Sequence, residues 1–219
     1  MSKVALVTGN DTGVGKTNVA ASLAKALFSM RPTRYVKVVE TGVADSKQSD
    51  VTRIKDLADE WIESMVALRS FEKALAPVAA ATMEGHALSL TELISETRQS
   101  SKGEGWTIVE GAGGVAVPLD SSGDDWRDFA VNLPVDLVIL VLENRLGAIN
   151  QMRLLEAYCS ALTMPCGFWL NEVRTQESEI VNVNKGALLE STLPIWATQR
   201  FGKEPVFTDI SWLNKIQNE

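Results

Sequence analysis

Apolar segments alternate with helical patterns along the whole chain, and this alternation predicts a parallel sheet covered by helices. The apolar segments are rich in Val, Ile and Leu without polar alternation, which is typical of strands buried on both faces. We expect strands at Val4–Thr8, Arg34–Val38, Thr107–Glu110, Leu137–Leu142 and Gly167–Asn171, with a weaker candidate at Pro194–Ala197. We expect helices at Thr17–Ser29, Asp50–Ala67, Ser89–Ser101, Ala148–Leu162 and Glu177–Leu189. The predicted fold class is α/β, a three-layer, mostly parallel sheet with helices on both faces.

The predicted elements follow one another without an internal repeat or a low-complexity linker. A chain of 219 residues suits one domain with its own core, so we expect a single domain over residues 1–219. The tetrad Ser89-Leu-Thr-Glu92 has the form of a capping box and marks the start of the third predicted helix. The polar run 120–125 predicts a loop between a strand and a helix.

The first predicted strand runs directly into the sequence Gly9-Asn-Asp-Thr-Gly-Val-Gly-Lys-Thr17, which predicts a phosphate-binding loop. Glycines let backbone N–H groups crowd around an anion, and the following helix points its positive end at that anion. Lys16 supplies a cation for the outer phosphates, and Thr17 offers a hydroxyl group to Mg²⁺. We therefore expect a P-loop NTPase-like architecture with a nucleotide at this loop.

The loop is a variant of the usual motif, which has four residues between its first glycine and the Gly-Lys pair. Counting back from Gly15 places Asn10 where that glycine is expected, and Gly9 lies one residue too early. The alternative interpretation is a glycine-rich turn without a ligand. The strand before the loop and the apolar helix after it favour the phosphate loop.

Composition restricts the partners of the chain. The formal net charge of −7, without a block of Lys or Arg, argues against nucleic acid or an anionic membrane as a partner. The two cysteines, Cys159 and Cys166, and the one histidine, His86, are too few for a disulfide framework or a zinc site with several imidazoles. Because no membrane-spanning run and no secretory signal are present, we expect a cytoplasmic protein.

Candidate functional residues follow the predicted strands, at the edge where open α/β sheets bind their ligands. Lys37 lies late in the second strand, and its ammonium must reach either a cleft or, in the alternative interpretation, surrounding water. Glu110 ends the third strand, where a Mg²⁺-binding carboxylate is expected. Asp50 is a second candidate metal ligand, with a plain capping role as its alternative. Asn171 is a weak candidate for an adenine contact, because its amide both donates and accepts.

Several of these segments together resemble one family, the dethiobiotin synthetases. The run Asp11-Thr-Gly-Val-Gly-Lys-Thr17 is similar to that family's phosphate loop, including the shifted first glycine. Lys37 followed by Thr41-Gly42 resembles its second strand. The segment Val109-Glu-Gly-Ala-Gly-Gly-Val-Ala-Val-Pro-Leu119 resembles its most recognisable block. Leu146-Gly-Ala-Ile-Asn150 and Asn171-Glu-Val173 complete the matches.

The resemblance implies an ATP-dependent cyclo-ligase that converts 7,8-diaminopelargonate and CO₂ into dethiobiotin in biotin biosynthesis. It implies that CO₂ adds to one amine as a carbamate and that ATP phosphorylates this carbamate to a carbamic-phosphoric anhydride. The other amine then closes the ring and expels phosphate. The resemblance also implies a requirement for Mg²⁺ and a homodimer with active sites at its interface.

The same resemblance implies a set of site residues in this sequence. Catalytic roles are expected for Lys37, Lys16 and Thr12. ATP contacts are expected from Asn10, Asp11, Thr12, Gly13, Val14, Gly15, Lys16, Thr17, Asn18, Glu110, Gly113 and Asn171. The expected Mg²⁺ ligands are Thr17, Asp50 and Glu110. The expected contacts of the diamine or carbamate are Thr12, Thr41, Gly111, Ala112, Gly147 and Asn150, the last from the neighbouring subunit.

Three features depart from the family pattern. Val38 follows the strand-two lysine where the family usually has proline, and Val78 follows Pro77 where it usually has histidine. The segment 198–219 does not resemble the family's usual nucleotide-contacting end. These departures leave the preference for ATP, CTP or GTP open.

A partitioning-type P-loop ATPase, a binding switch on the same scaffold, is the main alternative function. Such proteins carry an extra lysine near the start of the loop, and residues 9–13 contain none. The synthetase domain of a cobalamin-type amidotransferase would need a fused glutaminase, for which the chain is too short. A plain nucleotide-binding module would leave Lys37, Glu40 and Glu110 without a role.

Overall fold

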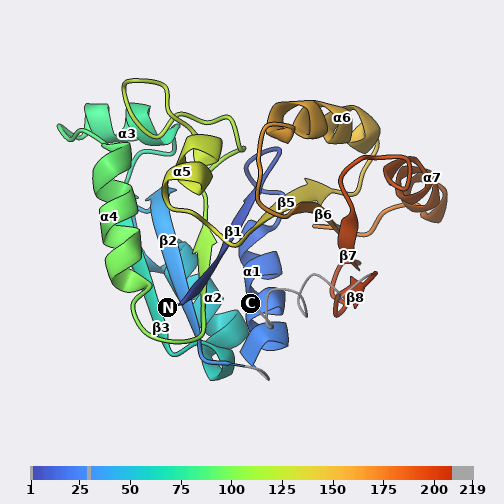
Figure 1. Ribbon diagram of the computed structural model, residues 1–219, viewed down its shortest axis with the longest axis horizontal. Coiled ribbons are helices and arrows are strands. Elements are labelled where there is room, and N and C mark those ends of the chain that lie inside the picture. Colours follow the sequence, from blue (N-terminus) through green and yellow to red (C-terminus); the bar gives the residue numbers. More distant parts are fainter. Residues whose placement is uncertain (1, 29–30, 209–219) are drawn as a thin grey trace.

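The strands of the computed structural model, which describes residues 2–28 and 31–208, form one sheet in the order β3-β2-β4-β1-β5-β6-β7-β8 (Figure 1). Neighbouring strands are parallel, except for the antiparallel pair β7 and β8 at one edge. The strands are β1 (Lys3–Gly9), β2 (Thr33–Thr41), β3 (Ser64–Phe71), β4 (Trp106–Glu110), β5 (Leu137–Glu143), β6 (Cys166–Asn171), β7 (Ile195–Gln199) and β8 (Val206–Phe207).

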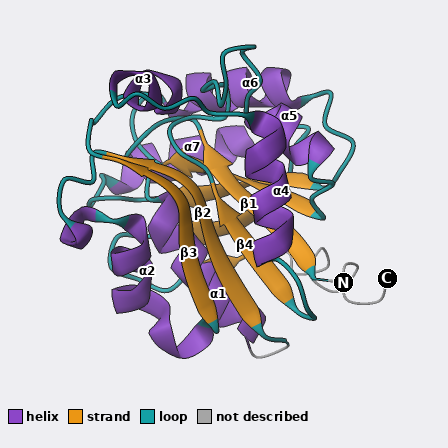
Figure 2. Ribbon diagram, turned by 90° about the vertical axis from the view of Figure 1, so that its left-hand side faces the viewer, coloured by secondary structure: helices purple, strands orange, loops and turns teal. Residues whose placement is uncertain are grey.

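Helices cover both faces of this sheet (Figure 2). One core lies under α1 (Lys16–Phe28) and α2 (Asp50–Ala58). The other core lies under α3 (Pro77–Met83), α4 (Leu90–Ser100), α5 (Trp126–Asn132), α6 (Ala148–Cys159) and α7 (Ser178–Leu188). Short 3₁₀ turns occupy Ser46–Gln48 and Asp59–Trp61. The three-layer α/β prediction is therefore confirmed. Within the described residues, no helix combines the length and apolar character needed to cross a membrane.

The central strands form because both of their faces are buried. All seven residues of β5 are apolar except its last, Glu143, and the first six are buried. β4 is buried along its whole length, including its terminal carboxylate, Glu110. Such continuous Val, Ile and Leu runs favour a parallel sheet with helices on both sides, as the sequence predicted.

The predicted helix over Asp50–Ala67 is wrong in its second half. α2 ends at Ala58, and Ser64–Phe71 forms the edge strand β3, which pairs with β2 from Arg34 to Thr41. An edge strand is only partly buried, and most of β3 is exposed or half-buried. β3 therefore lacks the continuous apolar run that identified the other strands. Its local pattern favours a helix, but pairing with β2 makes it a strand.

Other boundaries differ by a few residues. The strand over Arg34–Val38 extends to Thr41, and α6 ends at Cys159 rather than Leu162. The sequence did not predict the two-residue strand β8. The Ser89 hydroxyl accepts a hydrogen bond from the N–H of Glu92 at 3.4 Å, which confirms the predicted start of α4. Ser29 and residues 209–219, which belong to predicted segments, lie outside the described residues.

The sheet order brings the predicted functional segments to one edge. β4 lies between β1 and β2, and Glu110 is the register partner of both Val7 and Lys37. The strands β2, β3 and β4 lie on one side of β1, and the later strands β5 to β8 lie on its other side. The order of the strands therefore reverses direction at β1. Ligands bind at such a topological switch point, outside the carboxyl ends of the strands.

Trp126 in α5 supports the loop that follows β4. Its side chain is fully buried, and its indole N–H donates to the carbonyl oxygen of Ala112 at 3.0 Å. We expect Trp126→Ala to lower the free energy of unfolding by about 3–5 kcal/mol, because it leaves a cavity and an unpaired carbonyl group. Val131→Ala on the same helix removes a side chain that is 56% exposed and should change stability by less than about 0.5 kcal/mol. Urea unfolding of both variants tests this difference, and equal losses would contradict it.

Candidate active site

The loop between β1 and α1 has the backbone shape of a phosphate cradle. Gly13 and Gly15 have φ angles of +78° and +91°, a left-handed conformation that glycine adopts without strain. Gly9 has an ordinary φ angle, but a Cβ atom placed there would lie 2.5 Å from the carbonyl oxygen of Val141 in β5. The early glycine of the variant motif is therefore explained by its close approach to β5, and the turn itself depends on the later glycines.

Asn171, the last residue of β6, holds this loop through a hydrogen bond. Its buried amide nitrogen Nδ2 donates to the carbonyl oxygen of Val14 at 2.8 Å. A Cβ atom on Gly15 would lie 2.2 Å from the same nitrogen, so the amide fills the space next to the loop. This contact gives Asn171 a structural task that the sequence did not reveal. The predicted contact with adenine stays a prediction.

Lys16 joins the two loops that follow β1 and β4. Its ammonium group donates to the carbonyl oxygens of Asp11 and Gly113, both at 2.8 Å, and the residue is buried. Burial and repulsion from the neighbouring Lys37 together lower the pKa of Lys16 to about 8, against the attraction of Glu110. The cation of the loop therefore titrates much closer to neutral pH than an ordinary lysine.

A buried ion cluster connects β2, β4, α1 and α2. The Lys37 ammonium lies 2.7 Å from Glu110 Oε1, 2.6 Å from Asp50 Oδ2 and 3.0 Å from the carbonyl oxygen of Gly111. The Thr17 hydroxyl group donates to Glu110 Oε1 at 3.0 Å and lies 3.2 Å from Asp50 Oδ1. Lys37 thus pairs with the two carboxylates that the sequence suggested as metal ligands.

The charges of this cluster stabilise one another. Burial lowers the pKa of Lys37, but the carboxylates of Glu110 and Asp50 outweigh burial, so that the pKa is raised. Burial raises the pKa of Asp50, but Lys37 and the Thr17 hydroxyl outweigh it and leave the pKa lowered. Burial and the nearby Glu110 raise the pKa of Tyr35, whose hydroxyl group donates to Glu110 Oε2 at 2.9 Å. Lys37 and Asp50 are therefore ionised and Tyr35 is neutral around pH 7.

A cavity of about 380 Å³ opens between the loop and this cluster. Most of the predicted site residues line it, namely Thr12, Gly13, Gly15, Lys16, Thr17, Asn18, Lys37, Thr41, Asp50, Glu110, Ala112 and Gly113. The two lysines, the two carboxylates and the glycines of the loop therefore face one space. A metal-bound triphosphate needs cations, oxygen ligands and backbone N–H groups of this kind.

Four residues that the sequence analysis did not assign to the site also line this cavity: Glu40, Arg53, Val173 and Phe201. Arg53 follows Asp50 by three residues in α2, so helical spacing could have identified it. Its guanidinium donates to Asn18 Oδ1 at 3.2 Å. Phe201 lies in the segment that departs from the family pattern, yet it reaches the cavity. No signal in the sequence marked it.

Other predicted residues lie outside this cavity. Asn10 and Asp11 line a neighbouring cavity of about 380 Å³ with Gly114, Val115, Ala116, Val117, Gln151, Leu154, Leu155 and Tyr158. Val14 is buried beneath the loop. Gly147 caps α6 with a φ angle of +92°, and Asn150 is exposed in the first turn of that helix. Gly111 contributes its carbonyl oxygen to Lys37. The predicted ligand contacts of these residues stay predictions.

The oxygen atoms of Thr17, Asp50 and Glu110 suit Mg²⁺, which prefers carboxylate and hydroxyl ligands. The described residues contain no group of three or more His, Cys, Asp or Glu side chains that could hold a metal ion. Two carboxylates and one hydroxyl are nevertheless enough where phosphate and water complete the shell, which is the usual arrangement for Mg²⁺ in nucleotide enzymes. The residues present therefore fit a magnesium ion that arrives with a nucleotide.

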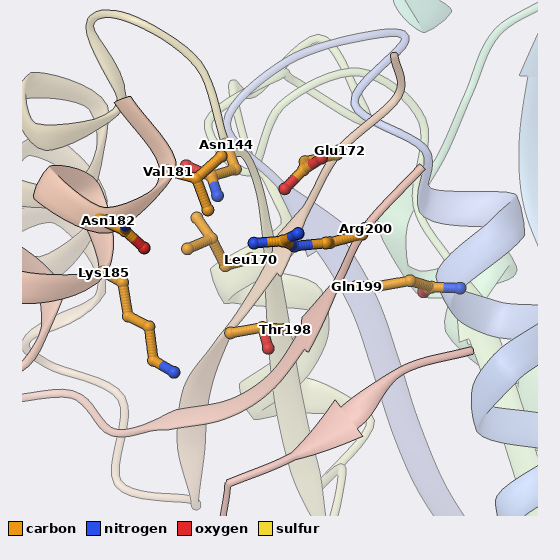
Figure 3. A pocket seen from close by; sticks show the side chains of 9 residues that line it. All are labelled: Asn144, Leu170, Glu172, Val181, Asn182, Lys185, Thr198, Gln199 and Arg200. Atoms are coloured by element: carbon orange, nitrogen blue, oxygen red, sulfur yellow. The ribbon is translucent and has the colours of Figure 1, made fainter. Parts of the chain in front are cut away.

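A smaller cavity of about 100 Å³ lies on the other side of β6, against α7 (Figure 3). Its lining includes the buried residues Asn144 and Glu172 and the exposed cations Lys185 and Arg200. It shares no lining residue with the cavity at the loop. The two cavities are therefore separate.

Comparison with known proteins agrees with this geometry. Residues 3–219 match the model of the AAA domain family. The ATP-dependent dethiobiotin synthetase BioD of Anaeromyxobacter dehalogenans is 32% identical over 190 residues, which cover 85% of this chain and 84% of the relative. The ATP-dependent dethiobiotin synthetase BioD of Rhodococcus erythropolis is 33% identical over 195 residues, which cover 84% of this chain and 85% of the relative.

A solved plasmid partition protein from Borrelia burgdorferi is similar in fold. The TM-score is 0.58, with 11% sequence identity over 99% of this chain and 95% of that protein. At this level of identity the similarity establishes the architecture alone.

The lowered pKa of Lys16 predicts how nucleotide affinity depends on pH. Lys16 is charged below about pH 8 and neutral above it, so affinity for a nucleoside triphosphate should fall as pH rises, by up to about tenfold between pH 7.5 and 9. Triphosphate ionisation is already complete in this range. Calorimetry at fixed Mg²⁺ measures the slope. Lys16→Arg, which stays charged, should remove the slope, and a slope unchanged in that variant would contradict the assignment.

Proposed function

Because this chain belongs to the family of ATP-dependent dethiobiotin synthetases, we propose that it joins CO₂ to 7,8-diaminopelargonate and closes the ring of dethiobiotin at the expense of ATP. Sequence identity of 32–33% over most of both chains supports this proposal. The observation that carries it is the position of Lys37, whose ammonium lines the same cavity as the loop lysine, Lys16. The ammonium group of Lys37 can bind an anionic acceptor beside the triphosphate.

The reaction proceeds in three steps. One amine of the diamine adds to CO₂, loses a proton and becomes a carbamate. A carbamate oxygen attacks the γ-phosphorus of ATP, ADP leaves, and a carbamic-phosphoric anhydride forms. The second amine attacks the anhydride carbonyl, the bond from carbon to the phosphate oxygen breaks, and phosphate leaves with that oxygen. The amine proton goes to solvent, and the product is a cyclic urea.

This chain supplies positioning and charge for these steps, which is most of what phosphoryl transfer requires. Lys16 and the backbone N–H groups around Gly13 and Gly15 bind the β- and γ-phosphates. Lys37 binds the carbamate and the oxygen atoms of the γ-phosphate as negative charge moves between them. No side chain acts as a covalent nucleophile, since the carbamate itself is the attacking group.

Thr17, Asp50 and Glu110 would hold the magnesium ion in this proposal. Bound there, Mg²⁺ offsets charge on the phosphate oxygens and orients the triphosphate. Lys37 pairs with both carboxylates at 2.6 and 2.7 Å, so its ammonium must move from them toward the acceptor when the metal ion is bound. The side chain is long and flexible enough for such a shift within the cavity.

The diamine would lie between the two cavities. Thr12, Thr41 and the backbone at Gly111 and Ala112 would contact its amines and the carbamate. The cavity beside Asp11 has several aliphatic walls, including Val117 and Leu154, and suits the hydrocarbon chain of the substrate. In a homodimer, the exposed N-terminus of α6 with Gly147 and Asn150 would bind the substrate carboxylate of the neighbouring subunit.

A partitioning-type ATPase switch is the second candidate, because a plasmid partition protein shares this architecture. Phosphate release distinguishes the two functions. The proposal predicts release that requires both bicarbonate and 7,8-diaminopelargonate, together with one dethiobiotin per phosphate by mass spectrometry. Phosphate release that is indifferent to both compounds, without dethiobiotin, would favour the switch. The same assay with CTP and GTP determines the nucleotide preference.

Lys37→Gln tests the role of the second lysine. We expect kcat to fall by about 10²–10³-fold, because the variant removes a cation that acts on charge in the transition state. The affinity for ATP, measured by calorimetry, should change by less than about threefold, since the loop and Lys16 remain. Lys25→Gln is the matched control, because Lys25 forms an exposed ion pair with Glu204 outside the cavity. A kcat equal to that of the control would remove Lys37 from the mechanism.

A further inference from the structure

Glu40 is a buried carboxylate at the wall of the nucleotide cavity, and none of the steps above uses it. Its side chain lies at the end of β2 and is 4% exposed. A buried carboxylate is costly unless several donors satisfy it. We propose that Glu40 is a positioning residue that fixes the start of α2 and thereby orients Asp50 toward the metal ion. The proposal rests on the proposed function only in taking Asp50 as a metal ligand.

The donors to Glu40 come from two elements that flank it. The N–H of Asp50 donates to Oε2 at 2.9 Å, and the Ser49 hydroxyl group lies 3.0 Å from both carboxylate oxygens. The hydroxyl group of Ser70 in β3 donates to Oε1 at 2.6 Å. Glu40 therefore joins the end of β2 to β3 and to the first residue of α2. Both oxygens of the carboxylate are occupied.

The start of α2 needs such an acceptor for two reasons. The first N–H groups of a helix have no partner within the helix, and the positive end of its dipole favours a negative charge. Ser49 caps α2 by accepting from the N–H of Val51 at 3.1 Å. The N–H of Asp50 is the next unpaired donor, and Glu40 satisfies it. The same carboxylate accepts a hydrogen bond from the Ser49 hydroxyl group and so holds the cap itself in place.

Asp50 depends on this anchor for its direction. Its backbone is tied to Glu40, while its carboxylate extends to Thr17 at 3.2 Å and to Lys37 at 2.6 Å. The Asp50 side chain is 30% exposed, so packing alone does not fix it. Without Glu40, the first turn of α2 would lose both its backbone acceptor and the partner of its cap. Because donors already occupy both of its own oxygen atoms, Glu40 would act on the metal ion through Asp50.

Glu40→Met tests the inference, because it keeps much of the side-chain volume and removes both acceptor atoms. The measurement is the affinity of a non-hydrolysable ATP analogue by calorimetry, with Mg²⁺ and with a chelator. In the natural protein, Mg²⁺ should tighten binding by a measurable factor. We call the ratio of the affinity with Mg²⁺ to the affinity in chelator the Mg²⁺ factor. In Glu40→Met the Mg²⁺ factor should fall by about tenfold, as for other groups that orient a metal ligand. The affinity in chelator should stay within about twofold of that of the natural protein. Glu40→Gln keeps one carbonyl oxygen as acceptor and should retain most of the factor.

Two controls separate positioning from a general loss of stability. Glu84 accepts the N–H of Lys73 at 2.9 Å away from the cavity, so Glu84→Met should leave the Mg²⁺ factor unchanged. If Glu40→Met does not fold, Ser70→Ala removes one donor to the carboxylate and should lower the factor in the same direction. An unchanged factor in the soluble Glu40 or Ser70 variant, or an equal fall in Glu84→Met, would overturn the inference.

The binding assay requires neither the diamine nor turnover. If the natural protein forms no dethiobiotin but Glu40→Met still loses the Mg²⁺ factor, the proposed reaction fails and the positioning role stands. If dethiobiotin forms and the factor is insensitive to Glu40, the positioning role fails and the reaction stands.

Discussion

The buried contact between Lys37 and Glu110 is the constraint on which the site depends. Burying either charge inside the sheet without the other would cost free energy. Loss of one partner from such a pair typically destabilises a protein by about 3–5 kcal/mol, because the remaining charge is left buried and uncompensated. The pair exists because β4 lies between β1 and β2, which makes Lys37 and Glu110 direct register partners. Donors from Tyr35 and Thr17 complete the shell of the carboxylate. The strand order therefore builds the charged centre.

This centre connects four segments that are far apart in the sequence. Lys16 links the loop after β1 to the loop after β4, and Asp50 brings the start of α2 to the same cluster. Asn171 supports the phosphate loop from β6. Lys16 and Asp50 line the cavity, so the nucleotide, a metal ion and an acceptor would meet groups that are already held in place. In an enzyme of this family, such preorganisation is the main source of rate enhancement in phosphoryl transfer.

Much of this arrangement could be predicted from the sequence, for physical reasons. The glycine-rich loop and the buried apolar strands have local signatures, and strand-end geometry then gathers Lys37, Glu110 and Thr41 at one edge. The edge strand β3 and the support from Asn171 could not be predicted. β3 is partly exposed and lacks a distinctive pattern, while Asn171 acts through one contact over 157 residues of sequence separation. The sequence predicted no contact for Glu40, because its donors depend on how α2 and β3 pack around it.

In the proposed reaction, this cavity joins the γ-phosphate of ATP to a carbamate, with Lys37 between them. The most direct test follows the oxygen atoms of CO₂ during a short reaction with [¹⁸O]CO₂ and unlabelled ATP. If a carbamate oxygen attacks phosphorus and leaves with phosphate on ring closure, the released phosphate carries one ¹⁸O atom for each dethiobiotin formed. Dethiobiotin formation with unlabelled phosphate, under conditions where CO₂ keeps its label, would contradict attack of a carbamate oxygen on phosphorus.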